Sequence, residues 1–217
     1  MAHTSSLRLH SRGFNLLEVL VAMLIVMVGL LGLAGMQARA QIAELESYQR
    51  AQALVLLYDM MDRLNNSRTT APCFAVTTDT AAGTNYFGTG ATAAAACSVS
   101  NPSDQAMAVA SMTAWNNLLQ GAAESKTVGG TPTNVGAMIG ARGCVSYDAA
   151  TEYLNATTLV AYGGTGEYTL SVSWQGMADT YAPVKACGAG LYGTTVANDT
   201  KRRTVWATMR VGTLAAR

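Results

Sequence analysis

Charged residues and histidines are scarce in this chain of 217 residues. Lysine, arginine, aspartate and glutamate make up 12% of the sequence, against 50% for hydrophobic residues. Both histidines, His3 and His10, lie among the first 13 residues. Residues 14–217 therefore cannot form a Ser-His-Asp or Cys-His catalytic site, and they lack the commonest metal ligand. A formal net charge of +1 gives no basis for electrostatic capture of nucleic acid.

The short motifs of metal, redox and nucleotide sites are also missing. The four cysteines, at positions 73, 97, 144 and 187, contain no C-x-x-C pair, which argues against a zinc site or a redox-active dithiol. The glycine-rich residues 163–166 lack the G-K-[ST] ending of a phosphate-binding loop and precede a predicted strand, so we interpret them as a turn. We expect no enzymatic activity, no cofactor and no metal.

A long apolar run extends from Phe14 to Met36 and carries a single charged residue, Glu18. A helix needs roughly 20 mainly apolar residues to cross a bilayer, so this run is long enough. A carboxylate in lipid costs free energy, and Glu18 is therefore predicted to have a function and a cationic partner. Arg8 and Arg12 precede the run and favour a cytoplasmic N-terminus, which places residues 37–217 in the periplasm.

Two other interpretations of the apolar run stay open. One is a cleaved secretory signal with Ala38-Arg39-Ala40 as its processing site. Its apolar core would exceed the usual length of about 7–15 residues, and Glu18 would have no role in it. The other is a plain uncleaved membrane anchor.

Helical periodicity continues past the apolar run, with no proline before Pro72. Glu46 with Arg50 and Asp59 with Arg63 are acid-to-base pairs at i,i+4, and each pair supports a helix by about 0.3 kcal/mol. The pattern predicts one helix over about residues 14–65, whose outer half carries an apolar stripe for a globular domain to cover. The stripe comprises Ile42, Leu45, Leu54, Leu57, Met61 and Leu64.

Three glycines interrupt the inner half of this helix: Gly29, Gly32 and Gly35. Each weakens a helix by about 1 kcal/mol relative to alanine. Their spacing of three predicts a flexible or closely packing patch, and it is not the four-residue small-xxx-small pattern of membrane helix dimers.

The rest of the chain reads as a small α+β domain. Residues 66–100 and 121–140 are predicted to be loops, the first with one short strand at Phe74–Thr77. Asn101 is a predicted helix cap with Pro102 at the first position, and the helix should run through Leu119. Its buried stripe would contain Val109, Met112, Trp115 and Leu119. Alternation predicts a half-exposed antiparallel sheet with strands at Arg142–Tyr147, Glu167–Gln175 and Thr204–Val211.

Four cysteines in even number fit two disulfides in an oxidising compartment. Three connectivities are possible, and the sequence does not rank them securely. We favour Cys73–Cys97, which would close the loop after the long helix, and Cys144–Cys187, which would tie one strand to the loop beyond the next strand.

The basic run Lys201-Arg202-Arg203 admits two interpretations, a contact to phosphate or DNA and a solvated turn, of which we favour the turn. The three tryptophans, Trp115, Trp174 and Trp206, are expected in the core or in subunit contacts.

Residues 12–20, Arg-Gly-Phe-Asn-Leu-Leu-Glu-Val-Leu, resemble the class III signal sequences of type IV prepilins and type II secretion pseudopilins. The resemblance implies that a prepilin peptidase cleaves between Gly13 and Phe14 and that Phe14 is then methylated at its new N-terminus. It also implies that Glu18 meets the N-terminal amine of a neighbouring subunit. Asn15 departs mildly from the pattern, which more often has threonine or serine there.

Four segments are similar to the type IV pilus modification protein family PilV: Leu16–Ala22 and Val28–Gln37 strongly, Arg142–Tyr147 and Tyr168–Trp174 more loosely. This resemblance implies a type IV pilin-like fold, with a long N-terminal helix packed on a small antiparallel sheet. Its expected segments are a leader (1–13), a membrane-spanning helix (14–36), a periplasmic helical continuation (37–65) and a head domain (66–217).

The function implied is that of a minor pilin. It would reside in the inner membrane, help to start pilus assembly with other minor pilins and the major pilin, and then sit at the extracellular pilus tip with an adhesin. Two alternatives stay open: a minor pseudopilin of type II secretion, and a DNA-uptake or adhesive pilin whose support is Lys201 to Arg203.

Overall fold

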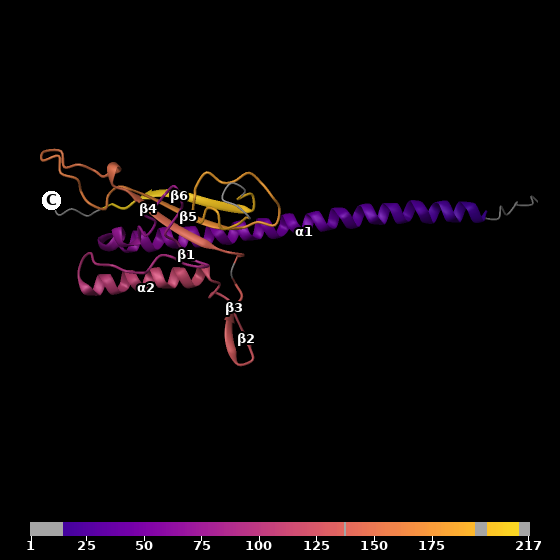
Figure 1. Ribbon diagram of the computed structural model, residues 1–217, viewed down its shortest axis with the longest axis horizontal. Helices are drawn as coiled ribbons and strands as arrows, with labels where there is room; N and C mark the ends of the chain where they lie inside the picture. Colours follow the sequence, from indigo (N-terminus) through magenta and orange to yellow (C-terminus); the bar gives the residue numbers. More distant parts are fainter. Residues whose placement is uncertain (1–14, 137, 194–198, 213–217) are drawn as a thin grey trace, which may run out of the picture. The chain divides into compact units, whose positions relative to one another are not determined.

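The computed structural model describes residues 15–136, 138–193 and 199–212. Figure 1 shows the long first helix, the second helix and the sheet. The sheet has four strands. The elements are α1 (Leu16–Asn66), η1 (Arg68–Phe74), β1 (Phe87–Gly88), α2 (Pro102–Leu119), β2 (Ser125–Val128), β3 (Thr131–Asn134), β4 (Arg142–Asp148), η2 (Ala149–Thr151), β5 (Glu167–Gln175) and β6 (Arg202–Arg210). The predicted α+β fold, with a long N-terminal helix followed by a small antiparallel sheet, is confirmed.

The chain divides into two compact units, of which the first ends at Leu45 and the second is Glu46–Arg217. The boundary lies inside α1, which continues through it as one helix. The outer part of α1, predicted as a separate continuation of the helix, thus contributes to the core of the second unit.

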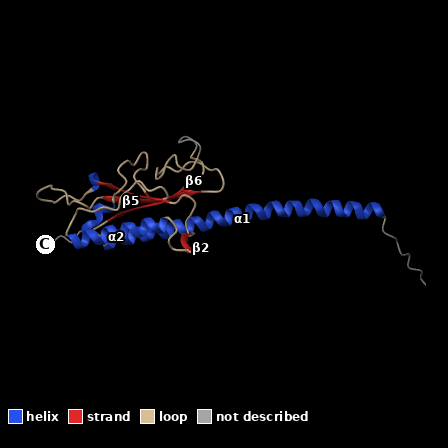
Figure 2. Ribbon diagram, turned by 60° about the horizontal axis from the view of Figure 1, so that its bottom comes forward, coloured by secondary structure: helices blue, strands red, loops and turns tan. Residues whose placement is uncertain are grey.

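The sheet has the strand order β1-β4-β5-β6, and each neighbouring pair is antiparallel. Its inner face packs against both helices, which lie on the same side of the sheet in Figures 1 and 2. Tyr168, Leu170 and Val172 of β5 are fully buried on the core side, as the sequence pattern predicts. The predicted half-exposed sheet is wrong for this central strand, because every residue from Leu170 to Trp174 is buried. The helices contribute Ala53, Leu57, Met60 and Leu64 from α1 and Ala108, Met112, Trp115 and Leu119 from α2.

Trp115 connects the two helices to the sheet. Its indole Nε1 donates a hydrogen bond of 2.9 Å to the backbone oxygen of Leu56 in α1. Its ring lies where a β-carbon on Gly143 would be, since that atom would come within 2.0 Å of the ring carbon Cη2. Gly143 therefore lets β4 approach α2 closely.

The second helix begins and ends as predicted. Asn101 caps it by accepting a hydrogen bond of 3.0 Å from the amide of Asp104, and Pro102 occupies the first turn. The helix ends before Gly121, whose φ of +87° is a conformation that glycine adopts without strain.

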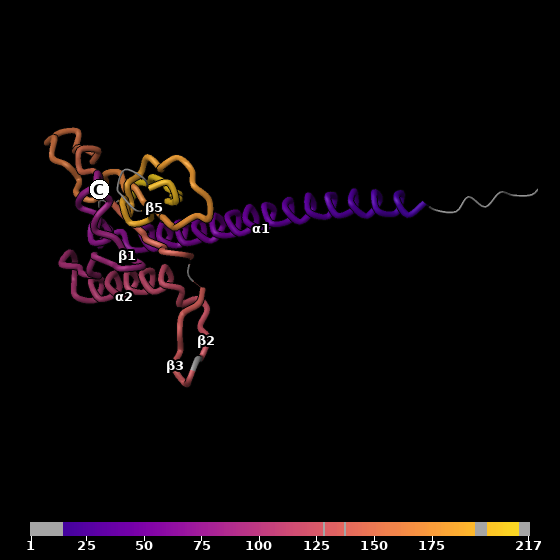
Figure 3. Tube along the Cα trace, turned by 45° about the vertical axis from the view of Figure 1, so that its right-hand side comes forward, coloured from indigo at the N-terminus to yellow at the C-terminus, as the bar shows by residue number. Residues whose placement is uncertain are grey.

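Two predictions in the loop regions are wrong. Residues 121–140 contain the antiparallel hairpin β2–β3, visible in Figure 3, which turns at Gly129 and Gly130 with positive φ at both. The fully exposed strand β3 has no apolar alternation that would have revealed it.

The short strand expected at Phe74–Thr77 is absent from the described chain, and a two-residue strand forms instead at Phe87–Gly88. Phe74 ends the η1 helix. Thr77 meets β4 through one backbone bond, from its amide to the oxygen of Val145, while its hydroxyl accepts from the Val145 amide. A side chain thus replaces the second backbone bond that a β-ladder needs.

Candidate functional site

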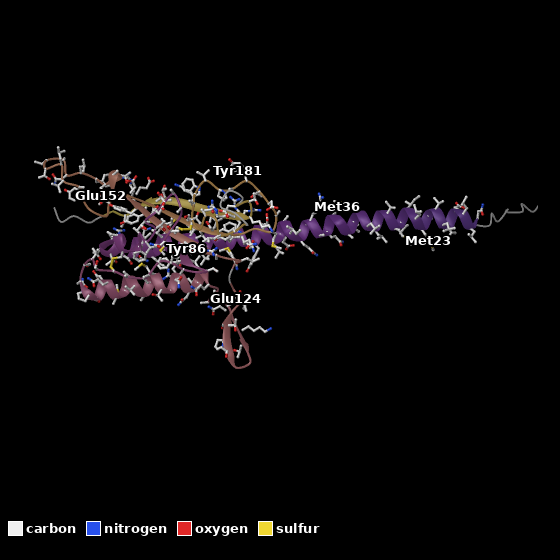
Figure 4. The ribbon with its side chains drawn as sticks, viewed as in Figure 1. Met23, Met36, Tyr86, Glu124, Glu152 and Tyr181 are labelled. Carbon is white, nitrogen blue, oxygen red and sulfur yellow. A yellow bond between two sulfur atoms is a disulfide. The ribbon has the colours of Figure 1, made fainter. Side chains whose placement is uncertain are left out.

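The inner segment of α1, Leu16–Met36, exposes apolar side chains around its whole circumference. Figure 4 shows Met23 and Met36 pointing away from the helix, and their side chains are 58% and 72% exposed. An 18-residue window of α1 has a mean hydropathy of 2.7, and among the described residues α1 is the helix long and apolar enough to cross a membrane. A helix that is apolar all round is typical of a membrane span.

Glu18 lies in the first turn of α1, and its amide donates a hydrogen bond of 2.9 Å to the oxygen of Asn15. The residue is exposed, and no hydrogen bond or ion pair joins its carboxylate to another described residue. A negative charge here is favoured by the helix dipole. Gly13 and Phe14, the predicted cleavage and methylation residues, lie outside the described residues.

The helix passes through Gly29, Gly32 and Gly35 without interruption. A β-carbon at any of these three positions would meet no atom within 4 Å. Within the described chain the glycines therefore leave a smooth stretch of helix surface, and neither a break nor close packing is seen there.

At the start of the second unit, Glu46 holds the loop between β5 and β6. One carboxylate oxygen accepts from the amides of Met177 (3.0 Å) and Ala178 (3.1 Å) and from the guanidinium of Arg203 (3.1 Å). We call these four residues the Glu46 clamp. Burial alone would raise the pKa of Glu46, but the amides and the Arg203 charge outweigh it and lower the pKa.

The clamp overturns the predicted Glu46–Arg50 pair, because Glu46 is joined to β6. An exposed i,i+4 pair contributes only about 0.3 kcal/mol, so an ion pair together with two hydrogen bonds to backbone amides prevails. The predicted Asp59–Arg63 pair is confirmed at 2.7 Å.

The basic run is not a solvated turn. The guanidinium of Arg202 is buried, pairs with Asp199, and donates to the backbone oxygens of Lys185 and Pro183. Arg203 belongs to the Glu46 clamp and also donates to the oxygens of Ala178 and Thr200. Sequence reasoning missed this structural use, although the i,i+3 spacing from Asp199 to Arg202 was a signal for it.

The structure contains the two disulfides that the sequence analysis favours, Cys73–Cys97 and Cys144–Cys187. The second joins β4 to the loop held by Arg202 and the Glu46 clamp. The described part of that loop is therefore held by a covalent bond, an ion pair and several hydrogen bonds, although its Tyr181 is 94% exposed.

Another polar cluster lies at the end of the sheet where β4 ends and β5 begins. The Tyr147 hydroxyl bonds to the carboxylate of Glu152, and the amide of Gly164 lies 3.0 Å from both groups. Burial and the Glu152 carboxylate raise the pKa of Tyr147, while the same hydroxyl lowers the pKa of Glu152. The cluster orders the turn at residues 163–166, in agreement with its predicted structural role.

Residues 8–34 match the family described as the prokaryotic N-terminal methylation motif. The match includes Gly13, Phe14 and Glu18. This match covers only the N-terminal segment of the chain, and it supports a type IV pilin-like protein. No curated protein and no solved structure matches it. The motif and the long apolar helix fit a membrane-anchored pilin that is processed by prepilin peptidase.

Proposed function

We propose that this pilin-like protein is a minor type IV pilin of the PilV kind, which helps to start pilus assembly and is incorporated at or near the tip. It would be inserted with a cytoplasmic N-terminus and a periplasmic head, cleaved before Phe14, and then carried outside the cell in the pilus. It would act by association with other minor pilins, the major pilin and a tip adhesin, and not by catalysis.

The observation that carries this proposal is the carboxylate of Glu18, which lies in an otherwise uncharged apolar helix surface and has no partner among the described residues. No lysine or arginine lies between Phe14 and Gln37. A carboxylate in this position needs a cation from elsewhere, and the methylated amine of another subunit's Phe14 supplies one in the membrane. The outer part of α1 and the sheet then form the head, which is attached to this assembly segment.

The test is the substitution Glu18→Ala, with Glu44→Ala as a matched control on an exposed position of the same helix. Glu18→Ala should be inserted and cleaved normally but should no longer co-purify with the other minor pilins. Glu44→Ala should behave as wild type. If Glu18→Ala co-purifies with these partners as well as wild type and restores surface pili, the proposal is wrong.

Of the two alternatives, a pseudopilin in a type II secretion machine would use the same N-terminal chemistry. Recovery of secretion components in place of pilins in the same co-purification would favour it. The DNA-uptake alternative loses its main support, because Arg202 and Arg203 are engaged within the head.

A further inference from the structure

Strand β6 forms one edge of the four-stranded sheet, and its free side is nine residues long. The opposite edge is different, because β1 has only two residues there. A long edge strand offers a row of backbone amides and carbonyls to any other extended chain.

The residues whose backbone groups point away from the sheet follow from the hydrogen-bond pattern. In β4, Val145 bonds to Thr77 through both its amide and its carbonyl, so these groups face away from β5. Backbone direction alternates along an antiparallel pair. In the registers of β4 with β5 and of β5 with β6, this alternation means that the backbone amides and carbonyls of Val205 and Ala207 face β5.

The outward groups are therefore those of Thr204, Trp206 and Thr208. Arg202 agrees with this assignment, since its amide bonds to the oxygen of Asp199 and not to β5. Among the described residues, no hydrogen bond is made to the backbone of these three outward positions.

The centre of this edge carries none of the devices that usually protect one, and its charged residues lie at the two ends of β6. From Thr204 to Met209 the sequence is Thr-Val-Trp-Ala-Thr-Met, without proline, glycine or charge. Threonine, valine and tryptophan favour strands, whereas protected edges use charges, proline, bulges or short length. No residue in this stretch therefore opposes pairing with another strand.

The core is also left open on the β6 side. The core-facing residues Ala207 and Met209 are only partly buried, while their cross-strand neighbours Leu170 and Tyr168 are fully buried. On the outer face Trp206 is 53% exposed, with the amine of Lys185 4.8 Å from its ring centre. An added strand would cover the two core residues and contact Trp206, a residue type common in interface hot spots.

Charge decides which strand fits. In the antiparallel register that pairs all three outward positions with a second copy, Arg210 of each copy would lie beside Arg202 of the other. Arg202 is already paired with Asp199, so a second copy would bring Arg210 no acidic partner. A strand with an uncharged centre and an acidic residue opposite Arg210 would supply that partner.

We propose that β6 is a docking edge, to which a different protein adds an extended strand with an uncharged, β-branched centre and an acidic residue opposite Arg210. The inference rests on the sheet and does not depend on the proposed pilus function. The added strand would bond to the amides and carbonyls of Thr204, Trp206 and Thr208.

The experiment uses the full chain in detergent and a synthetic peptide, Glu-Thr-Val-Thr-Val-Thr-Val-Thr-Glu, with blocked ends. Amide hydrogen exchange is measured at single residues. Saturating peptide should slow exchange at Thr204, Trp206 and Thr208 by about tenfold or more, and should leave the inner part of α1 unchanged. The same peptide with lysine at both ends should bind about tenfold more weakly.

A matched pair of variants tests the edge itself. Thr208→Pro removes one outward donor without touching the ladder to β5, and should weaken peptide binding about tenfold. Thr208→Val keeps the donor and should bind as wild type. The comparison of the two peptides on wild-type protein keeps the test valid if the proline variant fails to fold.

Three results would overturn the proposal. One is exchange at the three outward amides that does not respond to the peptide. Another is equal binding of the acidic and lysine-ended peptides, or of Thr208→Pro and Thr208→Val. The third is concentration-dependent slowing without peptide, which would show that β6 pairs with a second copy.

Discussion

The inner and outer parts of α1 differ in where their apolar side chains go. From Leu16 to Leu45 every residue is exposed, whereas the part beyond Glu46 buries Ala53, Leu57, Met60 and Leu64 completely or nearly so. Both parts belong to one uninterrupted helix.

The difference comes from the arrangement of polar residues around the helix. The outer part has an apolar stripe at spacings of four, three and four, and polar residues such as Gln52, Asp59 and Asp62 lie outside this stripe. The stretch Val19–Met36 has no charged residue on any side. A stripe can be covered by a protein core, but a helix that is apolar all round needs a bilayer or other helices. The three predictions below test this comparison, in order of decreasing expected effect.

The sharpest contrast is between two leucines of the same helix. Leu57→Ala should lower the free energy of unfolding of the head by about 3–5 kcal/mol, because it leaves a cavity in the core. Leu24→Ala should leave that free energy unchanged, because Leu24 is 64% exposed. Urea unfolding followed by tryptophan fluorescence measures both, and equal losses would contradict the division of α1 at residue 45.

An introduced acidic residue should have its large effect in the inner part of α1 and little effect in the outer part, which is the reverse of the leucine substitutions. Val26→Asp should raise the apparent free energy of membrane insertion by about 2.5–3.5 kcal/mol, because Val26 lies near the middle of the predicted span. Val55→Asp, at a position that is 66% exposed on the outer part, should change insertion and head stability by less than about 0.5 kcal/mol. An insertion assay in membranes decides, and no penalty for Val26→Asp would argue against a bilayer span.

The Glu46 clamp marks the boundary and should make head stability depend on pH. The pKa of Glu46 is lowered in the folded protein, so its contribution is present above the unfolded pKa and is lost as the pH falls through the folded value. Glu46→Gln should reduce stability at neutral pH by about 1 kcal/mol and flatten its fall at acid pH. Unfolding measured at several pH values checks this, with Glu44→Gln as the control. Parallel curves for Glu46→Gln and wild type would mean that the clamp contributes nothing.

The strongly periodic parts of the fold could be predicted from the sequence. The long helix, the capped helix with Asn101 and Pro102, and the alternating strand at Glu167–Gln175 all have local signals that tertiary contacts reinforce. The β2–β3 hairpin had no apolar alternation, and the Phe74–Thr77 prediction failed because a threonine hydroxyl took the place of a backbone bond.

The polar contacts of the head were harder to predict because their partners are far apart in sequence. Glu46 and Arg203 are 157 residues apart, and neither residue indicates the other without the fold. The N-terminal site was different. Its recognition depended on Gly13, Phe14 and Glu18, which lie within six consecutive residues, and the sequence was sufficient to indicate it.

The central claim is that the inner part of α1 is an assembly segment whose N-terminus is exposed when prepilin peptidase cleaves between Gly13 and Phe14. Mass spectrometry of the mature protein's N-terminus tests it most directly, with Gly13→Val as the control, since a larger residue before the scissile bond should block cleavage. We predict a mature chain that begins with methylated Phe14 in the wild type and an uncleaved precursor in Gly13→Val. A wild-type chain that still begins at Met1, or one that begins at Gln41 after a secretory signal, would contradict the account.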